Sequence, residues 1–86
     1  MTATMPDRLV LTPSAGRLLP LDDDLRPRPG DLVLAGQVVA LLEVSRAEVE
    51  IRTPFTGVVG DVMAVDGERL RDQQPVVWLR VGRPLV

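Results

Sequence analysis

Short apolar segments, separated by glycine and proline, follow one another along the chain. Glu48-Val49-Glu50-Ile51 alternates polar and apolar residues, which is typical of a strand with one face in water. Val38–Leu42 is apolar throughout and is expected to be a buried strand. No window keeps an apolar stripe at helical spacing over the roughly ten to twelve residues that a helix requires. The pattern therefore predicts an all-β fold.

The same pattern gives the positions of eight strands. Turn-forming residues bound them, because glycine and proline favour the backbone angles of turns. Trp78 is expected in the core of the last strand, where its ring fills space that valine side chains leave. We expect strands near Arg8–Leu11, Arg17–Leu19, Asp31–Leu34, Val38–Val44, Glu48–Arg52, Val58–Ala64, Arg69–Leu70 and Val76–Val81.

The two halves of the chain repeat one pattern. Thr12-Pro13-Ser14-Ala15-Gly16 recurs as Thr53-Pro54-Phe55-Thr56-Gly57, an offset of 41 residues. Gly30-Asp31-Leu32-Val33 recurs as Gly67-Glu68-Arg69-Leu70, an offset of 37, and the loop Pro20–Pro29 accounts for the difference. One such turn element alone indicates little. Because two elements recur in the same order, we predict two similar four-stranded antiparallel halves with a quasi-twofold axis, packed as a flattened barrel or sandwich.

Composition narrows the class of protein. A chain of 86 residues makes one domain, predicted over 9–81, with short tails at 1–8 and 82–86. The net charge of −2 and the dispersed arginines argue against nucleic acid. The longest apolar runs are far below the roughly 20 residues that cross a bilayer. The N-terminus also lacks the pattern of a signal peptide. We therefore expect no membrane association and a cytoplasmic location.

The chain has few side chains suited to catalysis. It contains no histidine, cysteine or tyrosine, so neither a metal site nor a set of catalytic residues is expected. Lysine is missing as well, because the ten lysine and arginine residues are all arginines. We therefore expect a protein that is not an enzyme. The arginines lie at positions 8, 17, 26, 28, 46, 52, 69, 71, 80 and 83.

The segment Glu43–Gly57, EVSRAEVEIRTPFTG, carries a resemblance to a known family. It resembles the lipoyl-attachment hairpin of the acyltransferase component of 2-oxo acid dehydrogenase complexes, of the form E-T-(D/A)-K-A-x-V-E-(V/I)-x-x-P-x-x-G. It is similar, less closely, to the E-A-M-K-M hairpin of biotin carboxyl carrier proteins and to the hairpin of the glycine cleavage H protein. The resemblance implies the barrel-sandwich fold of the lipoyl/biotinyl carrier superfamily.

Other segments extend the resemblance from about Leu9 to Val81. Gly30–Gln37 is similar to the family's G-D-x-V-x-x-G-Q stretch, and Val65–Leu70 is similar to its V-x-x-G-x-x-(V/L) stretch. Thr12–Gly16 is closer to the A-P-x-x-G element of the biotinyl branch. The hairpin thus favours the lipoyl branch and the opening element favours the biotinyl branch, and the sequence leaves this choice open.

Arg46 stands where the family carries its modified lysine. Biotin and lipoate are attached as amides of a lysine ε-amine, which reacts in its neutral form. A guanidinium keeps its proton at physiological pH and does not serve as that nucleophile. The family implies lipoate or biotin as cofactor, yet this chain has no lysine that accepts either. We therefore expect no covalent cofactor on this chain.

Three interpretations follow. The favoured one is a non-catalytic accessory or degenerate carrier subunit, which contacts protein partners, such as carboxylase or dehydrogenase subunits, through the hairpin with its tip at Val44–Ala47. The second is a small-molecule binder or cofactor-independent enzyme that uses the Arg46 hairpin. The third is a biotin or lipoyl carrier in which Arg46 replaces a natural lysine. The candidate site residues are Glu43, Ser45, Arg46, Glu48 and Arg52.

Overall fold

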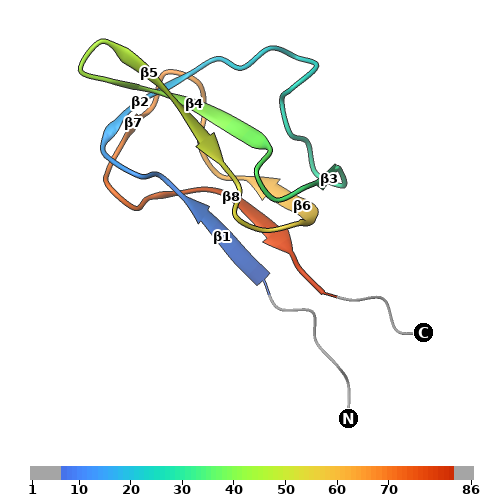
Figure 1. Cartoon of the computed structure of the whole chain (residues 1–86). Coiled ribbons are helices and arrows are strands. Elements are labelled where there is room, and N and C mark those ends of the chain that lie inside the picture. The colour runs from blue at the N-terminus through green and yellow to red at the C-terminus, as the bar shows by residue number, and fades with distance from the viewer. Residues whose placement is uncertain (1–6, 83–86) are drawn as a thin grey trace.

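Eight strands make up the regular structure of residues 7–82, the part of the chain that the computed structural model describes (Figure 1). Within these residues there is no helix long and apolar enough to cross a membrane. The strands are β1 (Asp7–Leu11), β2 (Gly16–Leu19), β3 (Leu32–Val33), β4 (Val38–Val44), β5 (Ala47–Arg52), β6 (Gly57–Val62), β7 (Arg69–Leu70) and β8 (Pro75–Arg80).

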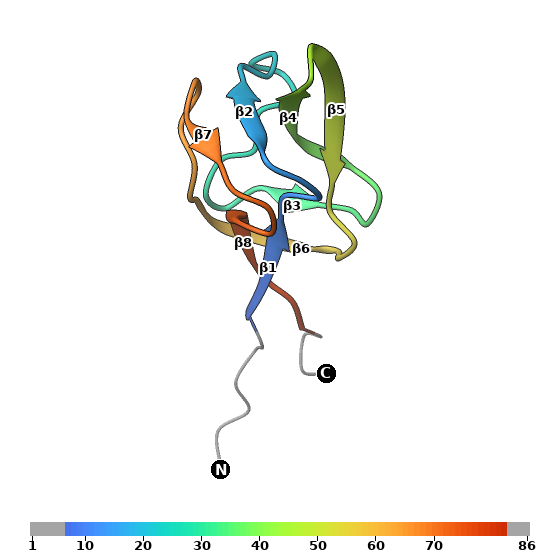
Figure 2. The same cartoon turned by 90° about the vertical axis from the view of Figure 1, so that its left-hand side faces the viewer.

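The strands form two antiparallel four-stranded sheets, which pack as a flattened sandwich (Figure 2). The strand order is β1-β8-β6-β3 in the first sheet and β5-β4-β2-β7 in the second. Each sheet takes two strands from the first half of the chain and two from the second. Neither half therefore completes a sheet alone, and the fold must assemble as one unit.

A quasi-twofold relation between the halves is confirmed by the pairing. The β2–β4 pair aligns Leu18 with Leu42, and the β6–β8 pair aligns Val59 with Leu79. These residues correspond at the offsets of 41 and 37 that the sequence repeat predicts. β4 and β8 each also carry one residue without a partner at the equivalent position, Val39 and Val76. Such bulges let two successive side chains face the core, and both positions are buried.

Buried threonines begin the two related turns. Thr12 and Thr53 are each 1% exposed. The Thr12 hydroxyl donates to the main-chain oxygen of Arg71 at 2.6 Å and accepts from the N–H of Gln74 at 3.0 Å. The Thr53 hydroxyl instead serves its own turn, because it donates to the Phe55 carbonyl and accepts from the Phe55 N–H. Each threonine thus keeps buried polar groups paired, and Thr12 also links distant parts of the chain.

The core between the sheets is aliphatic. Leucine and valine supply most of it, and the inner faces of both sheets contribute. Phe55 packs against this core from its edge. The buried residues are Val10, Leu18, Val33, Val39, Ala40, Leu42, Ile51, Val59, Ala64, Leu70, Val76, Val77 and Leu79.

The predicted strands are confirmed, with ends that differ by up to two residues. β3 is shorter than expected because its neighbours form turns: the Asp31 carboxylate accepts from the Arg28 N–H, and the Leu34 N–H donates to the Gln37 side chain. The core position expected for Trp78 is wrong. Val77 and Leu79 point inward, so Trp78 lies on the outer face of its sheet, partly exposed. The predicted tails lie largely outside the described residues.

Arg26 holds the long loop between β2 and β3 against the sandwich. Its guanidinium donates to both carboxylate oxygens of Asp66, the nearer at 3.0 Å, and to the main-chain oxygen of Leu21. The hydrogen bond and charge of Asp66 raise the pKa of Arg26, so the cation persists at every physiological pH. The insertion that distinguishes the first half of the repeat is therefore tied to the second half.

Replacing either of the two equivalent core leucines is expected to destabilise the fold by a similar amount. Leu42→Ala and Leu79→Ala should each lower the free energy of unfolding by about 2–5 kcal/mol, because both side chains are fully buried. Urea denaturation measures the change. Leu25→Ala is the matched control, since that side chain is 54% exposed and should cost little. A small effect at Leu42 or Leu79 would contradict the shared core.

Candidate functional site

The β4–β5 hairpin has the shortest turn that joins two antiparallel strands. Val44 pairs with Ala47, so Ser45 and Arg46 alone form the loop. Their φ angles are 49° and 68°, and both residues are exposed. Positive φ at both central positions defines a type I′ turn, whose twist matches that of the flanking strands. The turn therefore presents the Arg46 side chain outward at the end of a regular ladder.

This turn is strained by its sequence. Type I′ turns favour Asn-Gly, because glycine accepts positive φ without a steric penalty, whereas serine and arginine do not. Across residues 7–82, three non-glycine residues have positive φ: Ser45, Arg46 and Gln73. Each costs on the order of 1–3 kcal/mol in such a position. Two of the three meet at the hairpin tip, which is an arrangement that stability alone does not favour.

The hairpin tip lies at the end of the molecule opposite to the first residue of β1 and the last of β8 (Figures 1 and 2). This follows from the quasi-twofold relation, because β8 and β1 occupy in their sheet the places that β4 and β5 occupy in the other. The tip is therefore accessible from a side on which the described chain neither begins nor ends.

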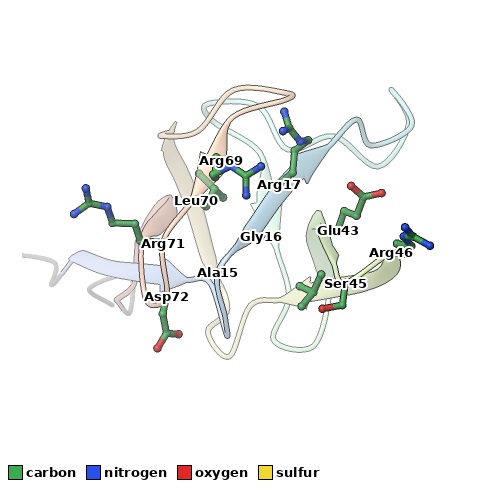
Figure 3. A pocket seen from close by; sticks show the side chains of 11 residues that line it. Ala15, Gly16, Arg17, Glu43, Ser45, Arg46, Arg69, Leu70, Arg71 and Asp72 are labelled. Atoms are coloured by element: carbon green, nitrogen blue, oxygen red, sulfur yellow. The ribbon is translucent and has the colours of Figure 1, made fainter.

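A groove of about 480 Å³ lies beside the tip, between β2, β7 and the hairpin (Figure 3). It is a surface feature, because its charged lining residues are exposed. Gly16 forms part of the floor, where a side chain would collide with the main-chain oxygen of Glu43. The lining consists of Ala15, Gly16, Arg17, Glu43, Val44, Ser45, Arg46, Arg69, Leu70, Arg71 and Asp72.

Three of the predicted site residues line this groove: Glu43, Ser45 and Arg46. Glu48 pairs with Glu43 across the hairpin, so both lie on the same outer face of the sheet. Arg52 lies at the other end of β5, where it pairs with Val38 in the ladder. The structure thus brings four of the five predicted residues to one end of the hairpin and places Arg52 away from them.

Arg52 has a structural role at its own end of the hairpin. It donates to the main-chain oxygen of Gly36 at 2.6 Å and forms a salt bridge with Glu50 at 2.7 Å. These contacts fix the loop that precedes β4. Arg52 therefore has its partners at this end of the hairpin and does not contribute to the surface at the tip.

The sequence interpretation missed the arginines on the neighbouring strands. Register places Arg17 of β2 directly between Glu43 of β4 and Arg69 of β7. Glu48, Glu43, Arg17 and Arg69 thus form one row across the outer face. The repeat carries the signal that reveals this: its equivalents of Arg17 and Arg69 are Val58 and Leu32, which also pair with each other. Both arginines are therefore specific to one of the two sheets.

The chemistry of the site does not fit the cofactors of carrier domains. Covalent biotin or lipoate requires a lysine amine, and the chain contains none. What the site offers is guanidinium groups, which bind carboxylates and phosphates through paired, charge-assisted hydrogen bonds. The groove is therefore suited to recognising an anion and unsuited to carrying an acyl or biotinyl group.

Comparison with known proteins gives a family and a fold. The biotin/lipoyl family, described as "Biotin-requiring enzyme", matches residues 10–79. This match spans most of the chain, which therefore belongs to that family of carrier domains, themselves non-catalytic. No curated protein sequence matches the chain.

Two solved structures share the fold. A single-chain, multi-domain long-chain acyl-CoA carboxylase aligns with a TM-score of 0.77 and 13% identity over 98% of this chain. The urea carboxylase of Kluyveromyces lactis aligns with a TM-score of 0.74 and 20% identity over 92% of this chain. The alignments span only 8% and 7% of those two proteins. Domains of this fold thus form small parts of large carboxylase chains.

Relieving the strain at the tip is expected to stabilise the protein. Ser45→Asn/Arg46→Gly should raise the free energy of unfolding by about 1–2 kcal/mol, because this pair adopts a type I′ turn at lower cost. Urea denaturation measures the gain. Gln73→Gly is the control, since it relieves a positive φ of 59° outside the hairpin. A double variant less stable than the wild-type protein would show that the tip stores no strain.

Proposed function

We propose that this chain is a carrier-type domain without a covalent cofactor, which acts by contact with a protein partner. The observation that supports this most directly is Arg46 at the tip of an intact attachment hairpin, in a chain without lysine. The hairpin keeps the two-residue loop and the outward position that present a side chain to another protein. Its chemistry, however, has changed from a nucleophile to a permanent cation.

The strain at the tip supports a function for these residues in contact. Ser45 and Arg46 adopt positive φ at a cost that glycine or asparagine would reduce. Backbone strain persists where the surrounding structure enforces it, and it is concentrated at functional sites. Neither side chain packs into the core. Contact with another molecule therefore explains the presence of Ser45 and Arg46 at the tip better than a contribution to stability does.

The partner that we propose is a protein of a carboxylase or 2-oxo acid dehydrogenase type system. Domains of this fold sit within carboxylase enzymes, and the two matched carboxylases include such a domain as a small part of a much longer chain. This module, without an attachment lysine, would take an accessory role in such a system in the cytoplasm.

Binding of a small molecule is a second candidate function. The groove beside the tip has a volume of about 480 Å³, within the range of about 300–1,000 Å³ of small-molecule sites. Such sites are usually concave and lined mainly by apolar side chains, with few polar groups. Here six of the lining residues are charged, and the groove lies on an outer sheet face. A protein partner therefore fits this surface better.

Restoring the lysine tests whether the hairpin remains an attachment hairpin. Purified wild-type protein, incubated with ATP and either biotin and a biotin protein ligase or lipoate and a lipoate ligase, is expected to keep the mass of the bare chain. Arg46→Lys is expected to gain one biotinyl or one lipoyl group, because the lysine then stands at the exposed turn. Intact-mass spectrometry measures both results, and the cofactor accepted identifies the branch.

Arg28→Lys is the matched control, because it places a lysine in an exposed loop outside the hairpin. It is expected to remain unmodified. A wild-type chain that carries biotin or lipoate, in this assay or when isolated from its native host, would overturn the proposed function. An Arg46→Lys protein that accepts neither group would contradict the equivalence of Arg46 and the attachment lysine.

A further inference from the structure

The groove beside the hairpin concentrates positive charge on an acidic protein. Four of its lining residues are arginines, Arg17, Arg46, Arg69 and Arg71, against the two acidic residues Glu43 and Asp72, while the whole chain carries a net charge of −2. The Arg46 and Arg71 side chains extend to opposite sides of the site (Figure 3). Among residues 7–82, salt bridges join only Arg26 and Arg52 to carboxylates. The four arginines of the groove are thus without a salt bridge in the described part of the chain.

The pairing of Arg17 with Arg69 carries a cost. The two residues are directly opposite on neighbouring strands of one sheet and are both exposed (Figure 3). Like charges in this arrangement destabilise a sheet. Arg17 donates one hydrogen bond, at 3.1 Å, to the main-chain oxygen of Gly67, which leaves its other donors available. An anion bound between the two guanidiniums would convert this repulsion into attraction.

The fold does not require these arginines. The quasi-twofold relation places Val58 and Leu32 at the equivalent positions of the other sheet, with the same pairing and with exposed side chains. The same backbone therefore accepts an uncharged pair. Arg17 also faces Glu43, of opposite charge, but Arg69, on the edge strand, faces Arg17 alone. Since neither arginine adds to the core, binding is the physical reason that the structure offers for the pair.

The spread of the cations selects the kind of ligand. Arg17 and Arg69 lie on adjacent strands, roughly 5 Å apart. Arg46 lies in the turn beyond the end of β4, on the side of the row of Glu43 and Arg17 that is away from Arg69. One phosphate or carboxylate cannot reach all of them. A peptide with acidic side chains at alternate positions can, because such side chains recur about every 7 Å along an extended chain.

The groove also contains features that suit a peptide. Val44 is half-buried and contributes an apolar side chain to its lining. Glu43 and Asp72 add negative charge beside the guanidiniums, which disfavours acidic side chains in those two places and thereby limits the register.

We propose that the groove between β2, β7 and the hairpin tip binds an acidic segment of the protein partner, with Arg17 and Arg69 as a paired carboxylate clamp and Arg46 and Arg71 as flanking contacts. This rests on the proposed function, to which it adds the docking surface and the chemistry of the partner. Electrostatic complementarity of this kind gives orientation and rapid association.

A labelled synthetic peptide tests the groove directly. Fluorescence anisotropy would follow a peptide of about ten residues in which Glu and Ala alternate, since this spacing matches an extended chain. The wild-type protein is expected to bind it, and binding should weaken as salt is raised. Arg17→Gln/Arg69→Gln should weaken binding by about tenfold or more, because the paired charge-assisted bonds are lost. The control Arg8→Gln/Arg28→Gln removes the same charge outside the groove and should change affinity by less than about twofold.

The thermal midpoint of the double variant provides the check on folding. Arg17→Gln/Arg69→Gln removes the repulsion between the two arginines, but it also removes the Arg17 hydrogen bond to Gly67 and the pairing of Arg17 with Glu43. These small effects oppose each other, so Tm should change little and lost binding would not reflect an unfolded protein. Equal losses of affinity in the variant and its control would overturn the proposal, because binding would then follow net charge alone. Displacement of the peptide by an equal concentration of inorganic phosphate would also overturn it, in favour of a site for small anions.

Capture from the native cytosol separates this proposal from the proposed function. Recovery of a stoichiometric partner by the wild-type protein and by the control, but not by Arg17→Gln/Arg69→Gln, is the expected result. Recovery of the same partner by all three proteins would overturn the groove assignment and leave the proposed function standing. Recovery of no partner by any of them would overturn both.

Discussion

The mutual dependence of the two halves is the constraint on which the rest of the structure depends. Each sheet contains two strands from each half, so no subset of neighbouring strands buries its apolar face alone. A short chain with neither a disulfide nor a large aromatic core depends on this arrangement, because small domains bury a smaller fraction of their surface than large ones do. The hydrogen bonds of the Thr12 hydroxyl with Arg71 and Gln74 are one local example, because they join the first half of the chain to the second.

The quasi-twofold relation makes departures from symmetry informative. Strand order, bulge positions and the paired leucines of the core repeat in both halves, because both must fill the same space between the sheets. The outer faces are not bound by that requirement. There one sheet carries the pair Val58 and Leu32, and the other sheet carries Arg17 and Arg69 at equivalent positions. Such differences between equivalent outer-face residues have a cause other than packing of the core.

The hairpin tip presents a side chain outward on a two-residue turn, but that side chain is not a lysine. Its two-residue loop holds a side chain outward, as a carrier hairpin does. That side chain is a guanidinium, which does not replace the lysine amine that biotin or lipoate attachment requires. Membership of the biotin/lipoyl family accounts for the fold of residues 10–79 and leaves the use of the tip to be explained. The strained backbone at Ser45 and Arg46 and the arginines beside them are the basis for proposing that the tip binds a partner and does not carry a covalent group.

The sequence by itself determined the all-β class, the eight strands, the repeat and the absence of lysine. Periodicity, turn residues and composition are properties of the chain that can be read without knowing which segments pair. It did not determine the bulges at Val39 and Val76, which shift the alternation and leave Trp78 on an outer face. It also named Arg52 as a site residue, which the register places at the far end of β5. Only the tertiary structure brought Arg17 and Arg69, 52 residues apart, into one row beside Arg46. Cross-strand neighbours depend on pairing between distant segments, and no spacing along the chain encodes them.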